Sequence, residues 1–318
     1  MARITMRKGP TKNPIEEIYP AFLSSVAARG AKDKTLSTYK QHFRSISKRL
    51  DVTTPIEDLT KRDLDKMISI MREEQLSESS INSFTRTLKV FLSWCNEEGY
   101  TSLNISLYKA SETVKETYSD EELLLLLKRP PASCNFCEFR NWSIVNFLLN
   151  SGCRASTVRN IQIQDVDLTR RQIIMRHSKN RKLHVIPLCS AMISILKEYM
   201  DIRGGKPSDY LFCNEFGNYL TENALRLAIV KYNRSRGVDR TSIHAFRHTF
   251  ARKYLVDCGG DAFTLQKLMG HSTLNMTKHY CNIFDSEVVD GFEHYSPLAQ
   301  MKKTNGKYIK KQTIKEQE

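Results

Sequence analysis

The spacing of apolar residues changes once along this chain, and that change constrains the fold more than any other feature of the sequence. In most of the chain, apolar residues recur every three to four positions, as on one face of an α-helix. Between residues 161 and 188 the period falls to two, which predicts short strands at 161–168, 171–177 and 183–188. The last two flank a polar turn at 178–182 and should form a hairpin. The sequence therefore predicts a mixed, mainly α-helical fold with one small antiparallel sheet.

The first hundred residues carry four amphipathic helical patterns. Asn13 is expected to cap the first helix, with Pro14 at the first helical position. Thr60 and Asp63 have the spacing of a capping box at the start of the third helix, and Ser77 begins the fourth. Four such helices are enough for a compact helical domain.

A polar, irregular stretch separates this helical part from the rest of the chain. After it, Ser119 begins a new run of helices. We expect five segments: a flexible basic N-terminus at 1–12, a helical domain at 13–101, a linker at 102–118, a second, mixed domain at 119–300 and a basic tail at 301–318.

The formal net charge is +14, and positive charge is in excess in residues 1–110, 111–300 and 301–318 alike. Charge spread over the whole length fits a protein that surrounds a polyanion better than one with a single basic tail. An ordinary solvated basic surface is the alternative. On the helical domain the cations fit either a surface that follows DNA phosphates or solvated helix faces equally well. They are Lys34, Lys40, Arg44, Lys48, Arg86 and Lys89.

Membrane and secreted classes do not fit this sequence. No apolar run approaches the roughly 20 residues that a helix needs to cross a bilayer. The start, MARITMRKGPTKN, lacks the apolar core of a signal peptide, so we expect a cytoplasmic protein with its eight cysteines mostly reduced. Cys134 and Cys137 form a CxxC pair, but no second pair follows at zinc spacing, which favours plain thiols over a metal site.

Residues 241–251, TSIHAFRHTFA, contain the clearest chemical motif. Thr241 or Ser242 should cap a helix that runs to Cys258. His244 and Arg247 are three residues apart and therefore share a helix face. An imidazole beside a guanidinium suits a phosphate oxyanion, because arginine offers a flat fork of donors and histidine exchanges protons near neutral pH. Alone, an HxxR in a basic protein is often a coincidence.

Four further residues make the HxxR pair more specific. Arg154 follows Gly152 at a corner between two helices, and Lys179 lies in the hairpin turn. His271 follows Gly270, and Tyr280 lies in the next helical pattern. The set contains no paired carboxylate, metal-ligand cluster or glycine-rich nucleotide loop, and it fits phosphoryl transfer in which cationic donors replace a metal. A tyrosine hydroxyl can then be the nucleophile.

The sequence resembles the tyrosine recombinases, the phage-integrase family of site-specific DNA recombinases. The matching motifs, in chain order, are SGCRAST, SKNRKLHVIPL, HAFRHTFA and LMGHSTLNMTKHY. They cover about 119–290, and the helical N-terminal part is similar to the family's core-binding domain in pattern only.

The resemblance implies a role for each residue of the set. Tyr280 would attack the scissile phosphate, form a 3′-phosphotyrosyl bond and free a 5′-hydroxyl. Arg154, Arg247 and His271 would stabilise charge on the phosphate. Lys179 would give a proton to the leaving 5′-oxygen, and His244 would accept one from Tyr280.

The resemblance also implies partners: double-stranded DNA with specific recombination sites, and three further copies of the chain in a homo-tetramer. No cofactor, metal or ATP is required by this chemistry. The segment after Tyr280 could dock on a neighbouring copy through Val288, Val289 and Phe292 or pack on its own domain. Integration or excision of a mobile element is the expected role, and resolution, for example of chromosome dimers, stays open beside it.

Two departures and two alternatives stand beside this interpretation. Thr157 replaces a glutamate that relatives usually carry three residues after the first arginine, and Ser178 replaces a common glycine. A type IB topoisomerase-like relaxase would share the chemistry but act alone on one duplex. A catalytically idle DNA-binding protein would share only the scaffold.

Overall fold

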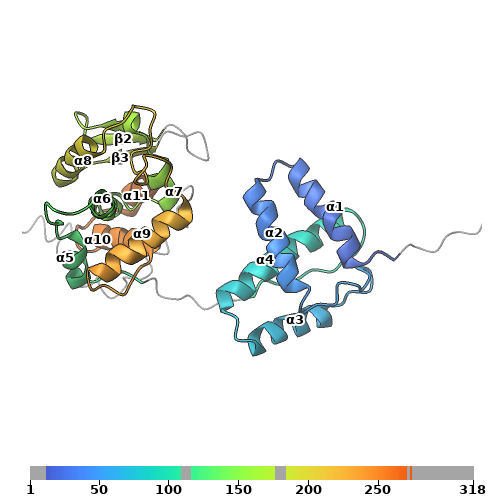
Figure 1. Cartoon of the computed structure of the whole chain (residues 1–318). Helices are drawn as coiled ribbons and strands as arrows, with labels where there is room; N and C mark the ends of the chain where they lie inside the picture. The colour runs from blue at the N-terminus through green and yellow to red at the C-terminus, as the bar shows by residue number, and fades with distance from the viewer. Residues whose placement is uncertain (1–11, 109–115, 176–183, 271–272, 274–318) are drawn as a thin grey trace, which may run out of the picture. The chain divides into compact units, whose positions relative to one another are not determined.

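The computed structural model describes residues 12–108, 116–175, 184–270 and 273 (Figure 1). The chain divides into two compact units, Met1–Thr113 and Val114–Glu318. Most of the described residues lie in helices, and the strands are few and short, so the predicted mainly α-helical class is confirmed. Across the residues that the structure describes, none of the helices is both long and apolar enough to cross a membrane.

The first unit is a four-helix domain around an aromatic core. Its helices are α1 (Ile15–Ala28), α2 (Asp33–Ile46), α3 (Lys61–Glu73) and α4 (Glu78–Glu97). Tyr19 of α1 stacks on Phe43 of α2 with ring centroids 3.8 Å apart, and Phe22 meets Phe91 of α4 edge-on at 5.4 Å. Because α1 contacts both α2 and α4, burial of these rings holds the three helices together.

The ends of these helices follow local sequence, with one exception. Thr60 and Asp63 form the predicted capping box, and Ser77 caps α4 as predicted. The prediction for α1 was wrong by one position, because Pro14 is itself the cap residue and Asn13 bonds to the Glu57 side chain instead. The reason is tertiary: the amides of the first turn donate to backbone carbonyls of residues 52 and 54, so no side-chain cap is needed.

The second unit packs its elements around α6 (Phe136–Ser151), which is buried along most of its length and, within the described residues, has its main contacts with four other helices (Figure 1). Those neighbours are α5 (Asp120–Leu127), α8 (Ser190–Arg203), α9 (Glu222–Ser235) and α10 (Ile243–Leu255). Shorter helices in the described part of this unit are α7 (Ala155–Asn160), the 3-10 helix η1 (Ile163–Asp165) and α11 (Ala262–Met269). The buried residues of α6 include polar ones such as Arg140 and Ser143, whose side chains bond to backbone carbonyls, as burial of polar groups requires.

In the described part of the chain, the sheet has three antiparallel strands in the order β1 (Val166–Asp167), β2 (Gln172–Met175) and β3 (His184–Pro187). The predicted hairpin is confirmed by the pairing of β2 with β3, and its turn lies outside the described residues. The predicted strand at 161–168 is largely wrong, because a strand of the sheet forms only at residues 166–167, and Gln162 makes an isolated bridge with Tyr210. Residues 161 and 163 pair instead with the backbone of residues 209–211, and η1 follows.

Candidate active site

Arg154 lies at a tight corner between two helices. The last helical residue of α6 is Ser151, and Gly152 caps it in the left-handed conformation with φ 58°. Arg154 is the cap residue of α7, as the sequence predicted for a helix-to-helix corner. A Cβ atom on Gly152 would lie 2.3 Å from Cδ1 of Phe250, so only glycine lets α10 pack this closely against the corner.

Arg247 is buried on α10 and connects this corner to the end of α11. Its side chain is only 5% exposed. Nη1 donates to the Gly152 carbonyl at 2.6 Å, and Nη2 donates to the Met269 carbonyl at 3.1 Å. A guanidinium held by two carbonyls has a fixed plane, which is the property needed to orient donors on a phosphate.

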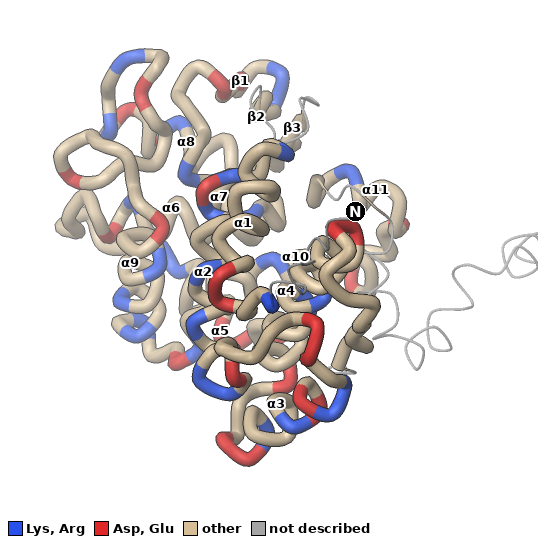
Figure 2. The backbone as a smooth tube through the Cα atoms, turned by 90° about the vertical axis from the view of Figure 1, so that its right-hand side faces the viewer, with Lys and Arg blue, Asp and Glu red and all other residues tan. Residues whose placement is uncertain are grey.

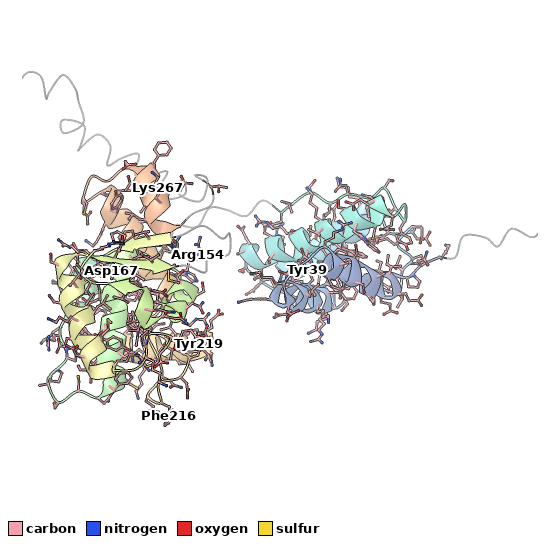
Figure 3. All side chains as sticks on the ribbon, turned by 90° about the horizontal axis from the view of Figure 1, so that it is seen from above. Tyr39, Arg154, Asp167, Phe216, Tyr219 and Lys267 are labelled. Atoms are coloured by element: carbon pink, nitrogen blue, oxygen red, sulfur yellow. The ribbon has the colours of Figure 1, made fainter. Side chains whose placement is uncertain are left out.

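The end of α11 brings Arg154 to the same place. Gly270 caps α11 in the left-handed conformation, and its carbonyl accepts from Nη1 of Arg154 at 3.3 Å. Figure 3 labels Arg154 together with Lys267, which lies on α11. Arg154 and Arg247 are therefore bound to successive carbonyls, those of Gly270 and Met269, although they come from different helices.

The other predicted catalytic residues fall partly outside the described chain. His244 is exposed in the first turn of α10, one helical turn before the buried Arg247. His271 directly follows Gly270 in sequence, and it lies outside the described residues with Lys179 and Tyr280. Val288, Val289, Phe292 and the basic tail also lie outside them. The structure thus brings together Arg154 and Arg247 and leaves the roles of the six residues as predictions.

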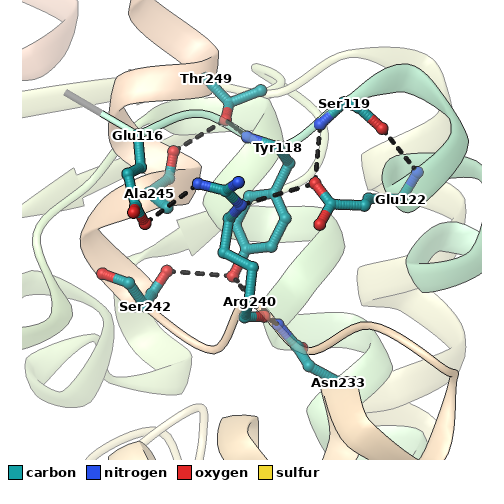
Figure 4. Close-up of polar contacts among 9 residues, drawn as sticks. All are labelled: Glu116, Tyr118, Ser119, Glu122, Asn233, Arg240, Ser242, Ala245 and Thr249. Atoms are coloured by element: carbon teal, nitrogen blue, oxygen red, sulfur yellow. Dashed lines mark hydrogen bonds and ion pairs between the residues drawn. The ribbon is translucent and has the colours of Figure 1, made fainter. Parts of the chain in front are cut away.

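A polar network fixes the start of α10, and sequence reasoning missed it (Figure 4). The Tyr118 hydroxyl lies 3.1 Å from the Ser242 carbonyl and accepts from Asn233 Nδ2 at 3.0 Å. The Tyr118 amide donates to the Thr249 hydroxyl at 2.8 Å, and its ring stacks on Phe246 at 4.2 Å. Tyr118 therefore holds the helix of His244 and Arg247 at two points along its length.

Arg240 links the same region to the start of the second unit. It forms ion pairs with Glu116 at 3.0 Å and with Glu122 at 3.6 Å. The prediction that Thr241 or Ser242 caps α10 was right in position, since Ser242 is the cap residue, but wrong in mechanism, since its side chain makes no capping hydrogen bond. The helix also ends at Leu255 rather than at Cys258, because the amides of Cys258 and Gly260 donate to carbonyls five and six residues earlier instead of four.

The thiol of Cys153, the residue before Arg154, is a poor nucleophile. Burial raises the pKa of Cys153, beside Arg154, to about 11, so this thiol stays protonated near neutral pH. Cys134 and Cys137 are half-buried thiols. Within the described ranges, the structure contains no group of three or more His, Cys, Asp or Glu side chains that could hold a metal ion.

The six predicted DNA-binding cations of the first unit are all exposed (Lys and Arg are blue in Figure 2). Lys34, Lys40 and Arg44 lie on α2 and Lys48 just beyond it, while Arg86 and Lys89 lie on α4. A 2.6 Å bond between His42 Nδ1 and the Thr87 hydroxyl joins the two helices. Exposure fits a DNA-facing role and a solvated surface alike, so the assignment stays a prediction.

Comparison with known proteins decides the family. The model of the phage integrase family matches residues 117–287, and that of the phage integrase N-terminal SAM-like domain matches residues 20–99. This chain belongs to the phage integrase family. It is a tyrosine site-specific recombinase, as the sequence motifs predicted.

Recombinases of known name and structure are similar over most of the chain. Tyrosine recombinase XerC of Oceanobacillus iheyensis is 26% identical over 266 residues, which cover 78% of this chain and 85% of that protein. XerD of the same organism is 23% identical and covers 85% and 95%.

Two solved structures share the fold of this family member. The Tn1549 transposon integrase in complex with transposon right end DNA has a TM-score of 0.71 at 21% identity, covering 89% of this chain and all (100%) of that one. A lambda integrase tetramer bound to a Holliday junction has a TM-score of 0.69 at 18% identity and covers 85% and 78%.

Proposed function

We propose that this recombinase cuts and rejoins DNA at specific sites through a covalent 3′-phosphotyrosyl intermediate at Tyr280, without metal or ATP. One observation carries the proposal. Arg154 and Arg247 are 93 residues apart in sequence, yet they bind the carbonyls of two successive residues that immediately precede His271. Two cations fixed at one point suit the non-bridging oxygens of one phosphate.

The reaction needs a nucleophile, an acid, a base and charge stabilisation. The Tyr280 oxygen attacks phosphorus and the bond from phosphorus to the 5′-oxygen breaks. Lys179 gives a proton to that leaving oxygen, and His244 takes the proton of the tyrosine hydroxyl. Arg154, Arg247 and His271 stabilise the negative charge of the transition state, and the reverse reaction rejoins a strand without an external energy source.

Each unit has its own part in this proposal. The catalytic domain is assigned to 119–300 and the core-binding domain to 13–101, joined by the linker 102–118. The six exposed cations on and beside α2 and α4 would contact phosphates, which positions the protein on the duplex but does not by itself specify a sequence.

Recombination joins two duplexes, and the proposed assembly is a homo-tetramer on DNA. The lambda integrase neighbour was solved as a tetramer on a Holliday junction, and the Tn1549 neighbour is a transposon enzyme, which supports this assembly and a role in integration or excision of a mobile element. The segment after Tyr280 would connect neighbouring copies.

Covalent trapping tests the proposal. Full-length protein is mixed with labelled DNA from the borders of its own gene, in the presence of a chelator, and separated under denaturing conditions beside Tyr280→Phe. A DNA–protein complex absent from the variant is expected. Binding without any such complex on border DNA or a randomised library would indicate an idle binder. Relaxation of any supercoiled plasmid without strand exchange would indicate a topoisomerase.

A further inference from the structure

Three successive carbonyls at the end of α11 accept hydrogen bonds from three different elements. The Met269 carbonyl binds Arg247 of α10, and the Gly270 carbonyl binds Arg154 at the start of α7. The Leu268 carbonyl binds Nε2 of His184, the first residue of β3, at 3.0 Å. The last carbonyls of a helix have no amide partner within that helix, so they are free to accept from other elements.

His184 also packs against the backbone that carries these carbonyls. A Cβ atom on Gly270 would lie 3.0 Å from Cε1 and 3.2 Å from Nδ1 of the His184 ring. Gly270 has φ 62°, a conformation that other residues adopt at a cost. The ring of His184 therefore fits against a glycine that the helix end also requires for its turn.

Besides these bonds, α11 packs against α10 through a small apolar cluster, to which Phe250, Tyr254 and Leu255 also contribute. This helix has eight residues, and its buried side chains Leu265 and Met269 form a small cluster with Ala251 of α10, apart from the main core of the unit. His184 supplies a link from this helix to the sheet, since β3 pairs with β2 over four residue pairs. Without that link, the peptide groups that hold both arginines would have more freedom.

We propose that His184 is a positioning residue for Arg154 and Arg247: its hydrogen bond to Leu268 fixes the carbonyls that orient the two guanidinium groups. The inference rests on the proposed role of these arginines in stabilising the phosphate. His184 donates through Nε2 and touches no reacting atom.

Two variants separate the hydrogen bond from the volume of the ring. His184→Met fills similar space without a donor, whereas the amide of His184→Gln can donate from a similar position. The matched control is Tyr199→Phe, which removes a buried hydroxyl bond to the Leu211 carbonyl in the same unit. We expect single-turnover cleavage of labelled DNA to fall about tenfold in His184→Met, because misplaced charge-stabilising donors raise the barrier.

DNA binding, and cleavage by the other two variants, should change little. DNA affinity by gel shift stays within about twofold of the unmodified protein in all variants, and cleavage by His184→Gln and Tyr199→Phe stays within about threefold. Equal losses in His184→Met and His184→Gln, or an unchanged rate in His184→Met, would overturn the positioning role.

Hydrogen–deuterium exchange tests the contact between His184 and Leu268 without depending on DNA cleavage. Amides of residues 262–270 should exchange faster in His184→Met than in His184→Gln or Tyr199→Phe. Unchanged exchange in His184→Met would overturn the inference even if cleavage is lost. If the unmodified protein cleaves no DNA, the proposed function fails, and the exchange data alone decide whether His184 fixes the end of α11.

Discussion

Removal of one hydroxyl group, in Tyr118→Phe, tests how the start of α10 is held. The phenol is 3% exposed, and burial raises its pKa, so it remains a hydrogen-bond donor at every pH used for such enzymes. The variant loses the hydrogen bond from the hydroxyl to the Ser242 carbonyl and the one that the hydroxyl accepts from Asn233. The Asn233 amide still donates to the Arg240 carbonyl at 2.8 Å. A buried hydrogen bond contributes about 1 kcal/mol, and the buried Asn233 N–H left without its acceptor costs a similar amount, so we expect a loss of about 1–2 kcal/mol. The Ser242 carbonyl still accepts from the Ala245 amide at 3.1 Å and adds no such cost.

The free energy of unfolding is measured by urea titration of the full-length chain. For a unit of this size, the loss corresponds to a fall of about 3–6 °C in Tm. Tyr232→Phe is the control, because it removes a comparable buried bond, to the Leu126 carbonyl at 2.8 Å, away from α10. Both variants should lose similar stability, but only Tyr118→Phe should lower the single-turnover cleavage rate. Full stability in Tyr118→Phe, or equal cleavage by both variants, would refute this reasoning.

Three further substitutions test separate parts of the structure. Gly152→Ala should lower the free energy of unfolding by about 2–4 kcal/mol, since the new methyl group clashes with Phe250 at a left-handed residue; a neutral result in thermal unfolding would contradict the close packing of α10 on the corner. Thr60→Ala should cost about 1 kcal/mol at pH 7 through loss of the α3 cap. Hydrogen bonds from Thr60 lower the pKa of Asp63 below its ordinary value of 3.8. The stability that these bonds contribute is therefore present above that pH and is lost as pH falls through the pKa of the folded state. If the stability difference between Thr60→Ala and wild type is undiminished in urea titrations at pH 2, this pH dependence is wrong. Arg247→Lys should reduce cleavage about 10²–10³-fold with gel-shift affinity retained, and near-normal cleavage would exclude a role for the guanidinium fork.

Local features of the fold could be predicted from the sequence. Thr60, Ser77 and Ser119 cap the helices that they were expected to cap, because a side-chain bond to an amide three residues away depends on little else. The β2–β3 hairpin was predictable because the alternation of apolar residues matches its buried face.

Features set by tertiary pairing could not be predicted. Residues 161–163 have a strand-like pattern, but their backbone bonds to residues 209–211, and nothing in the local sequence indicates that partner. Asn13 does not cap α1 as expected, because backbone carbonyls of residues 52 and 54 accept from the first amides of that helix.

The candidate site shows the same division. The order of Arg154 and Arg247 could be read from the sequence, but their convergence on Met269 and Gly270 could not. His184 meets Leu268 across 84 positions, and Tyr118 meets Thr249 across 131, so neither contact has a local signal. The only signal for His184 was its place beside the hairpin turn that carries Lys179.

The most direct measurement is the identity of the residue that carries DNA in the trapped complex. The complex is digested with nuclease and trypsin, and the modified peptide is sequenced by mass spectrometry. Cleavage after Lys278 and Lys302 gives the peptide 279–302, which contains both Tyr280 and Tyr295. We expect the nucleotide remnant on Tyr280. A remnant on Tyr295, on a serine or on any other residue would contradict the proposed mechanism.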